Sequence, residues 1–164
     1  MIQLPLTKRP GFLTAVALAM LAAMPAVAED PIPTDLDASA AQDYLGIWNI
    51  KIEVMGRELE LILALSDLDG KAGATLDSAN QAEPLAIPSI TKTDDGGLEL
   101  SGELKFGGSF TIDIIINVLR EGDGLTGRVK DKGGLFNADL VGAAMTEDEL
   151  DSVQGRRPDP TEAR

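Results

Sequence analysis

Hydrophobic and polar residues alternate along residues 97–119, and a pair of glycines interrupts the alternation near its middle. Before the glycines, the hydrophobic positions are Leu98, Leu100, Leu104 and Phe106. After them, the hydrophobic positions are Phe110, Ile112, Ile114, Ile116 and Val118. A period of two on both sides of a short glycine turn predicts an antiparallel β-hairpin that buries one face. We expect the rest of the chain to be organised around this hairpin.

The same alternation predicts further strands before and after the hairpin, and together they number eight. They are expected at residues 47–54, 57–65, 71–76, 83–91, 98–106, 110–119, 125–130 and 135–141. The fourth strand contains Pro84 and Pro88, and proline has no N–H to donate to a ladder. We therefore expect this strand to be irregular, bulged or at a sheet edge.

The connections between the predicted strands are short, and most contain glycine beside Asp, Asn or another Gly. Short connections make sequential strands antiparallel neighbours, so that eight of them form an up-and-down meander. Closing the meander on itself covers its apolar face and removes exposed edges. The predicted fold is therefore an all-β, eight-stranded antiparallel up-and-down barrel. A two-sheet β-sandwich is the alternative.

The face opposite the predicted core is charged, which separates a soluble barrel from an outer-membrane barrel. Glu99, Glu103 and Lys105 occupy this face on one strand, and Lys51 and Glu53 occupy it on another. In a membrane barrel these side chains would line the lumen, and an eight-stranded lumen is too narrow to bury so much charge. We therefore expect no membrane insertion of the mature chain.

Residues 1–28 have the features of a secretory signal peptide. Lys8 and Arg9 precede an apolar stretch, and a small-residue cleavage site ends at Ala28. We expect a Sec-type signal, cleavage after Ala28, and a mature protein in the periplasm or outside the cell.

The predicted mature chain divides into three parts. Residues 29–43 form a leader with a short helical turn, capped by Asp37 or Ser39. Residues 44–142 form the barrel domain. Residues 143–164 begin with a capping box at Thr146 and Glu149, which predicts a short helix, and end in a disordered, acidic, proline-containing tail.

Composition excludes several classes of function. Removal of residues 1–28 leaves 12 basic and 27 acidic residues, a net charge of −15. This sign argues against nucleic acid as a partner, because phosphates require a basic surface. The chain contains no cysteine and no histidine, so it lacks thiol chemistry, thiolate metal ligands and the commonest general base. We expect no enzymatic activity, no cofactor and no metal site.

The acidic stretch Asp67-x-Asp69-Gly70 has the start of a calcium-loop pattern. The complete motif requires a glutamate at its twelfth position, and that position here is Ser78. We therefore interpret the stretch as a hairpin turn.

The tripeptide Gly46-Ile47-Trp48 lies where the predicted helical turn meets the first strand. It resembles the Gly-x-Trp signature of the lipocalins and the wider calycin superfamily, in which the Trp closes one end of the barrel. The resemblance implies a lipocalin-like barrel over about residues 44–141, with an Arg from the last strand over the Trp. The last predicted strand has no Arg, and Arg128 or Lys130 on the preceding strand is the expected substitute.

An eight-stranded barrel interior is wide enough to be filled by side chains or to hold one small ligand. The calycin resemblance implies the second use, and a lining with almost no polar group suits an aliphatic or lipid-like molecule with its head at an open mouth. The expected function is a periplasmic or secreted binding protein for such a ligand. The candidate ligand-binding residues are Trp48, Ile50, Ile52, Leu61, Leu63, Leu98, Leu100, Phe106, Phe110, Ile112 and Phe136.

The alternative function is a protein-binding or accessory structural module with a solid barrel core. Some secreted bacterial protease inhibitors resemble this barrel and insert an N-terminal arm into an active site. Residues 29–36 are extended and contain two prolines, which makes them the candidate arm here. Ile62, Ile115 and Leu119 on the outer face are a candidate contact patch for a protein partner.

Overall fold

The computed structural model describes residues 30–54, 56–78, 84–106 and 110–154, and it describes the backbone alone at 104–106, 110 and 154. The predicted signal peptide and most of the predicted tail lie outside these residues. The described helices are the 3-10 helix η1 (Ala38–Tyr44) and the α-helix α1 (Glu147–Gln154). The strands are β1 (Gly46–Val54), β2 (Arg57–Leu68), β3 (Lys71–Ser78), β4 (Leu85–Ile87), β5 (Ser89–Lys92), β6 (Leu98–Phe106), β7 (Phe110–Glu121), β8 (Gly124–Asp131) and β9 (Asn137–Met145).

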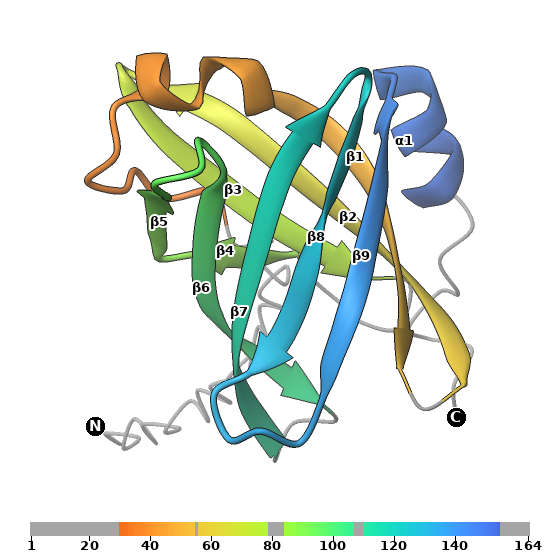
Figure 1. Ribbon diagram of the computed structural model, residues 1–164. Coiled ribbons are helices and arrows are strands. Elements are labelled where there is room, and N and C mark those ends of the chain that lie inside the picture. The colour runs from red at the N-terminus through yellow and green to blue at the C-terminus, as the bar shows by residue number, and fades with distance from the viewer. Residues whose placement is uncertain (1–29, 55, 79–83, 107–109, 155–164) are drawn as a thin grey trace, which may run out of the picture.

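These strands form one antiparallel sheet that is nearly closed into a barrel (Figure 1). The order across the sheet is β4-β3-β2-β1-β9-β8-β7-β6-β5, so strands consecutive in sequence pair with each other, except β4 and β5, which form the two edges of the sheet. In addition, β1 pairs with β9 along six residue pairs, which joins the two ends of the meander. The all-β, up-and-down barrel predicted from the alternation is therefore confirmed, in preference to the sandwich.

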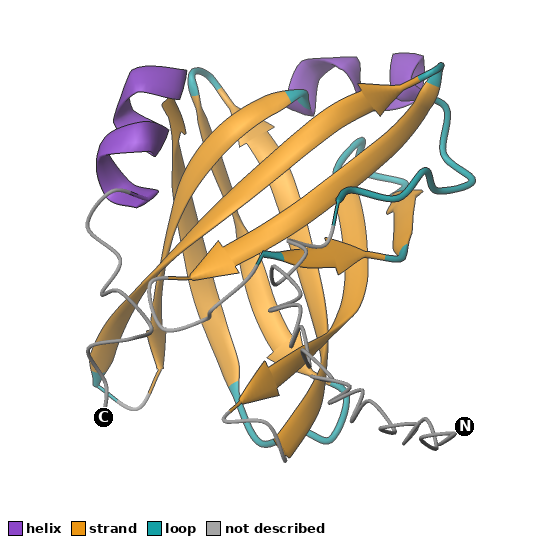
Figure 2. Ribbon diagram, turned by 180° about the vertical axis from the view of Figure 1, so that it is seen from behind, coloured by secondary structure: helices purple, strands orange, loops and turns teal. Residues whose placement is uncertain are grey.

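The additional strand arises at Pro88, within the predicted fourth strand. β4 pairs with β3 and ends before Pro88, whereas β5 begins after it and pairs with β6. Pro88 has no N–H to donate to a ladder, and the chain changes direction between β4 and β5 (Figure 2). Beside this bend, a Cβ built on Gly102 of β6 would lie 3.2 Å from Ile87 Cδ1. The Ile87 side chain thus packs against Gly102, which brings β4 close to β6 although these two strands are not hydrogen-bonded to each other.

The predicted hairpin turn at Asp69-Gly70 forms. Leu68 pairs with Lys71, which leaves a two-residue loop, and φ is 55° at Asp69 and 91° at Gly70. Positive φ at both loop residues is the type I′ geometry that suits the twist of hairpin strands. The Gly70 N–H also donates to Asp67 Oδ1, at 2.7 Å, so this aspartate serves the turn.

The central hairpin predicted at residues 97–119 is formed by β6 and β7. Phe106 pairs with Phe110, and the ladder continues to Leu98 opposite Val118. The glycine turn predicted between the strands lies outside the described residues.

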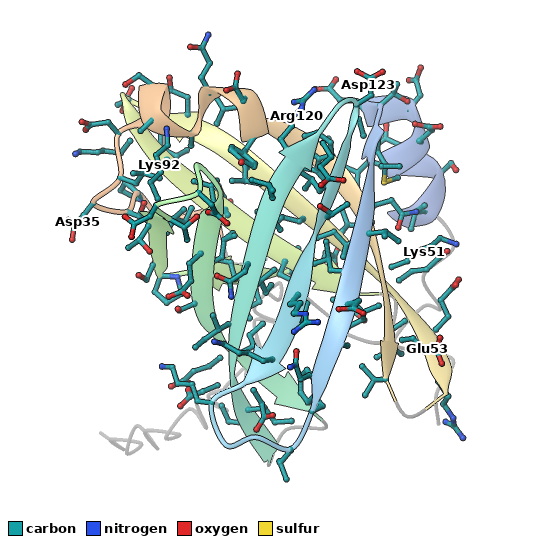
Figure 3. All side chains as sticks on the ribbon, in the orientation of Figure 1. Asp35, Lys51, Glu53, Lys92, Arg120 and Asp123 are labelled. Atoms are coloured by element: carbon teal, nitrogen blue, oxygen red, sulfur yellow. The ribbon has the colours of Figure 1, made fainter. Side chains whose placement is uncertain are left out.

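Inward-facing residues of all the longer strands meet in one hydrophobic core. Its buried strand residues are Trp48, Ile50, Ile52, Leu61, Leu63, Leu65, Ala72, Ala74, Leu76, Ile87, Ile90, Leu98, Leu100, Ile114, Ile116, Val118, Leu125, Val129, Ala138 and Leu140. The outer face is charged, as predicted. Lys51 Nζ lies 3.1 Å from Glu58 Oε1 and 3.0 Å from Glu60 Oε1, and Lys51 and Glu53 point away from the barrel (Figure 3).

Both helices lie at the same end of the barrel (Figure 1). The predicted side-chain cap of η1 is wrong: Asp37 precedes the helix but makes no capping hydrogen bond, because its carboxylate binds Lys71 Nζ at 2.7 Å. The predicted capping box before α1 forms. The Thr146 N–H donates to Glu149 Oε2 at 2.8 Å, and the Glu149 N–H donates to Thr146 Oγ1 at 3.3 Å.

Candidate functional site

One end of the barrel, here called the capped end, is closed by Tyr44 of η1 and Trp48 of β1. The Trp48 indole N–H donates to the Tyr44 carbonyl at 2.8 Å, and the Tyr44 hydroxyl donates to the Gly96 carbonyl at 3.0 Å. Trp48 is 2% exposed and Tyr44 is 4% exposed. Both aromatic side chains therefore bury their apolar surface and satisfy their polar atoms, which fixes them across this end of the interior.

Arg120, near the end of β7, covers this pair of aromatic residues. Its guanidinium carbon lies 5.1 Å from the centroid of the Trp48 ring, within cation–π range. The backbone N–H of Arg120 donates to the Tyr44 hydroxyl at 3.3 Å. Its Nε donates to the Gly122 carbonyl at 3.0 Å, and its Nη1 donates to the Asp43 carbonyl. Arg120 thus connects η1, β1 and the β7–β8 turn, beside η1 (Figure 3).

The prediction that Arg128 or Lys130 would lie over Trp48 is therefore wrong. On β8 the buried residues are Leu125, Val129 and Asp131, so Arg128 and Lys130 belong to the exposed outer row. The inward-facing residues of β7 occupy even-numbered positions that end with Val118, and Arg120 is the next position in this alternation. The sequence prediction ended this strand at Leu119 and missed Arg120, although its parity was the signal that could have found it.

At the opposite end of the barrel, inward-facing side chains become accessible. Along β7, Ile116 and Ile114 are each 1% exposed, whereas Ile112, which is nearest this end, is partly buried. The same change occurs along β1, β2 and the start of β9. We call this end the mouth and define it by the partly buried residues Val54, Leu59, Ile112 and Phe136.

The structure places the predicted ligand-binding residues whose side chains it describes together in the barrel interior. Nine of the eleven have described side chains, and all nine belong to the core or pack against it. Seven are buried, and Ile112 and Phe136 are partly buried at the mouth. The side chains of Phe106 and Phe110 lie outside the described part of the chain.

A buried carboxylate organises the β8–β9 loop at the mouth. Asp131 is 5% exposed, and its Oδ1 accepts the Phe136 N–H at 2.7 Å. Desolvation raises the pKa of Asp131, but backbone N–H groups of Leu135, Phe136 and Gly133 stabilise its charged form and together hold the pKa below its usual value. The loop places Phe136 at the mouth and leaves Leu135 68% exposed.

The segment before η1, which contains the candidate inhibitor arm, runs along β3. The Thr34 N–H and hydroxyl both donate to the Ala72 carbonyl, at 2.9 and 2.7 Å. The Ala72 N–H donates to the Leu36 carbonyl at 2.8 Å. Thr34 and Leu36 are therefore held on the barrel wall, and the inhibitor-like alternative stays a prediction.

Within the described ranges, no group of three or more His, Cys, Asp or Glu side chains is arranged to hold a metal ion. In the same part of the chain, no helix combines the length and apolar character needed to cross a membrane. Comparisons with protein families, curated proteins and solved structures found no match to this chain. The architecture alone, a nearly closed antiparallel barrel, is consistent with the calycin type in general.

Proposed function

We propose that the protein is a periplasmic or secreted binding protein that holds a small hydrophobic or lipid-like ligand inside its barrel, in the manner of a lipocalin. The observation that carries the proposal is the difference between the two ends of the interior. Trp48, Tyr44 and Arg120 close the capped end, whereas apolar inward-facing residues reach solvent at the mouth. An apolar chain would therefore enter through the mouth and lie along the inward-facing rows.

The chemistry of the lining supports the class of ligand. Asp131 is the one charged residue among the buried, inward-facing residues that the structure describes, and its carboxylate already accepts hydrogen bonds from its own loop. Arg120, at the capped end, is likewise already engaged by the Trp48 ring and by the Asp43 and Gly122 carbonyls. A charge inside the barrel would therefore be unpaired, and burying an unpaired charge is costly. A ligand with a charged head would keep that head at the mouth and insert its hydrocarbon part.

A substitution at the mouth tests this proposal. Ile112→Trp places a larger apolar side chain at the mouth, and Ile115→Trp adds the same side chain to the outer face of the same strand as a control. We expect Ile112→Trp to weaken binding of a fluorescent fatty-acid analogue about tenfold or more, because a bulky residue obstructs the apolar path. Ile115→Trp should bind like the unmodified protein.

Chain length gives a second measurement on the unmodified protein. Each methylene group buried on binding contributes about 0.8 kcal/mol, or roughly a fourfold gain in affinity. Affinity for saturated fatty acids should therefore rise with chain length until the interior is filled. Equal binding by both tryptophan variants, together with no dependence on chain length, would contradict the proposal.

A further inference from the structure

A hollow lies on the outer face of β7 and β8, where the β5–β6 turn and the start of β9 also border it. Its volume is about 520 Å³. It lies where β7 and β8 approach closely: a Cβ built on Gly127 would overlap the carbonyl oxygen of Asn117. The side chains that carry the argument are Asn117, Leu119, Thr126, Arg128, Lys130 and Asn137.

The register of the strands brings polar residues of two kinds together there. Asn117 of β7 pairs with Arg128 of β8, and Lys130 of β8 pairs with Asn137 of β9. Two cationic side chains, about 7 Å apart along β8, are thus each opposite an amide side chain on a neighbouring strand. Because the four residues share the outer face, they form one patch, which we call the β8 patch.

The cations of the β8 patch retain unused hydrogen-bond donors. Arg128 Nε lies 3.0 Å from Asp139 Oδ1, which fixes one edge of the guanidinium, and its two terminal nitrogens have no partner in the described part of the chain. Lys130 has no ion-pair partner among the described residues. By contrast, Lys51 binds two glutamates and Lys71 binds an aspartate on other parts of the outer face.

One carboxylate also borders the hollow. Asp95 Oδ1 accepts hydrogen bonds from the Thr93 hydroxyl and from the Gly97 N–H, the latter at 3.2 Å. The Thr93 hydroxyl, with help from the Gly97 N–H, lowers the pKa of Asp95, which keeps it ionised. This carboxylate is therefore engaged in the β5–β6 turn, and it leaves the two cations of the β8 patch to a ligand.

We propose that the β8 patch binds an acidic saccharide, that is, a sugar unit that carries a carboxylate. The guanidinium fork and the ammonium group are suited to the carboxylate. Each asparagine amide both donates and accepts hydrogen bonds, as the Thr126 hydroxyl does, and these groups are suited to sugar hydroxyls. Half-buried Leu119 offers apolar surface to the C–H groups of the ring. A simple anion would use the cations but not the amides.

The test is an NMR titration of the ¹⁵N-labelled mature chain with disaccharides of galacturonate, glucuronate and mannuronate. We expect at least one of them to shift the side-chain amide signals of Asn117 and Asn137. The corresponding neutral disaccharide and sodium glutarate, a carboxylate without hydroxyls, should shift them much less at the same concentration. If no uronate shifts these signals, or if glutarate shifts them equally, the proposal is wrong.

Variants then separate the two kinds of contact. Lys130→Gln removes one charge and should weaken uronate binding about tenfold, the usual effect of losing a hydrogen bond to a charged partner. Asn117→Leu removes one amide that would bind a neutral hydroxyl, and it should weaken uronate binding about fivefold. Lys51→Gln removes a charge from another part of the outer face and should leave binding unchanged. An equal loss in Lys51→Gln would show that net charge alone is responsible, and would overturn the proposal. Since the β8 patch lies on the outer face of the barrel, Lys130→Gln and Asn117→Leu should both leave the binding of a fatty-acid analogue unchanged.

Discussion

Arg120 places a permanent charge over the capped end of a largely apolar barrel interior. The charge is stabilised by the face of the Trp48 ring and by the carbonyl groups of Asp43 and Gly122. Each contact is modest alone, but together they connect parts of the chain that are far apart in sequence. We therefore attribute the closure of this end to Arg120 as well as to the aromatic residues beneath it.

Replacing Arg120 by Met tests this attribution. The variant keeps a long apolar side chain but loses the cation and the hydrogen bonds, and we expect it to be less stable by about 1–2 kcal/mol. Urea unfolding followed by the fluorescence of Trp48, the single tryptophan of the chain, measures this difference. The control is Arg128→Met, which removes an exposed ion pair worth about 0.5 kcal/mol or less. Equal losses in the two variants would contradict a special role for Arg120.

Parity along a strand explains which single residues could be predicted from the sequence. The inward positions of β1, β2 and β7 follow strict alternation, so Ile50, Leu63 and Ile114 were assigned to the core correctly. The same rule assigns Arg128 to the outer face and Arg120 to the inner row. The missing information was that β7 continues to Glu121, because the glycine- and aspartate-containing stretch at residues 121–124 indicates a turn.

At the scale of elements, turn chemistry and proline determined how much was predictable. The Asp69-Gly70 hairpin follows from residues that tolerate positive φ, so its sequence was sufficient to predict it. Proline predicted that the fourth strand would be irregular, but not that its halves would pair with different neighbours. That outcome depends on the packing of Gly102 against Ile87 across the gap, which is a contact between distant segments. The mouth was likewise not predictable, because it is defined by how far each strand extends.

The β8–β9 loop illustrates a polar contact that positions a residue at the mouth. The Asp131 carboxylate holds the loop through backbone N–H groups, and the Lys132 N–H donates to the Asp113 carbonyl of β7 at 2.9 Å. A Cβ on Gly133 would lie 2.9 Å from Asp131 Oδ2, so a side chain at this position would displace the carboxylate or the loop. Phe136 is thereby fixed beside the other residues of the mouth.

The stabilisation by Asp131 should depend on pH in a defined direction. Its folded pKa lies below the ordinary value of 3.8, so its contribution is complete above that pH and is lost as pH falls through the lower, folded pKa. We expect Asp131→Asn to be less stable than the unmodified protein at pH 7, and the difference to shrink below about pH 4. Urea unfolding at a series of pH values measures it. A difference that stays constant from neutral to acid pH would contradict this account of the loop.

At the scale of the whole molecule, the barrel separates two chemically different surfaces. The charged side chains in the middle of its described strands lie mainly on the outer face, whereas the inward-facing rows are largely apolar and end at the mouth. High net charge favours solubility. A charged outer face around an apolar interior that is capped at one end suits the carrier function that we propose.

The central claim, that this interior holds a hydrophobic ligand, is tested most directly by native mass spectrometry. The mature protein should be purified, without detergent, from the cells that produce it. We predict a mass above that of the polypeptide, with an excess that disappears after extraction with organic solvent and matches a lipid-like molecule in the extract. A mass equal to that of the polypeptide, together with Trp48 fluorescence that fatty acids do not change, would contradict the claim and indicate a solid core.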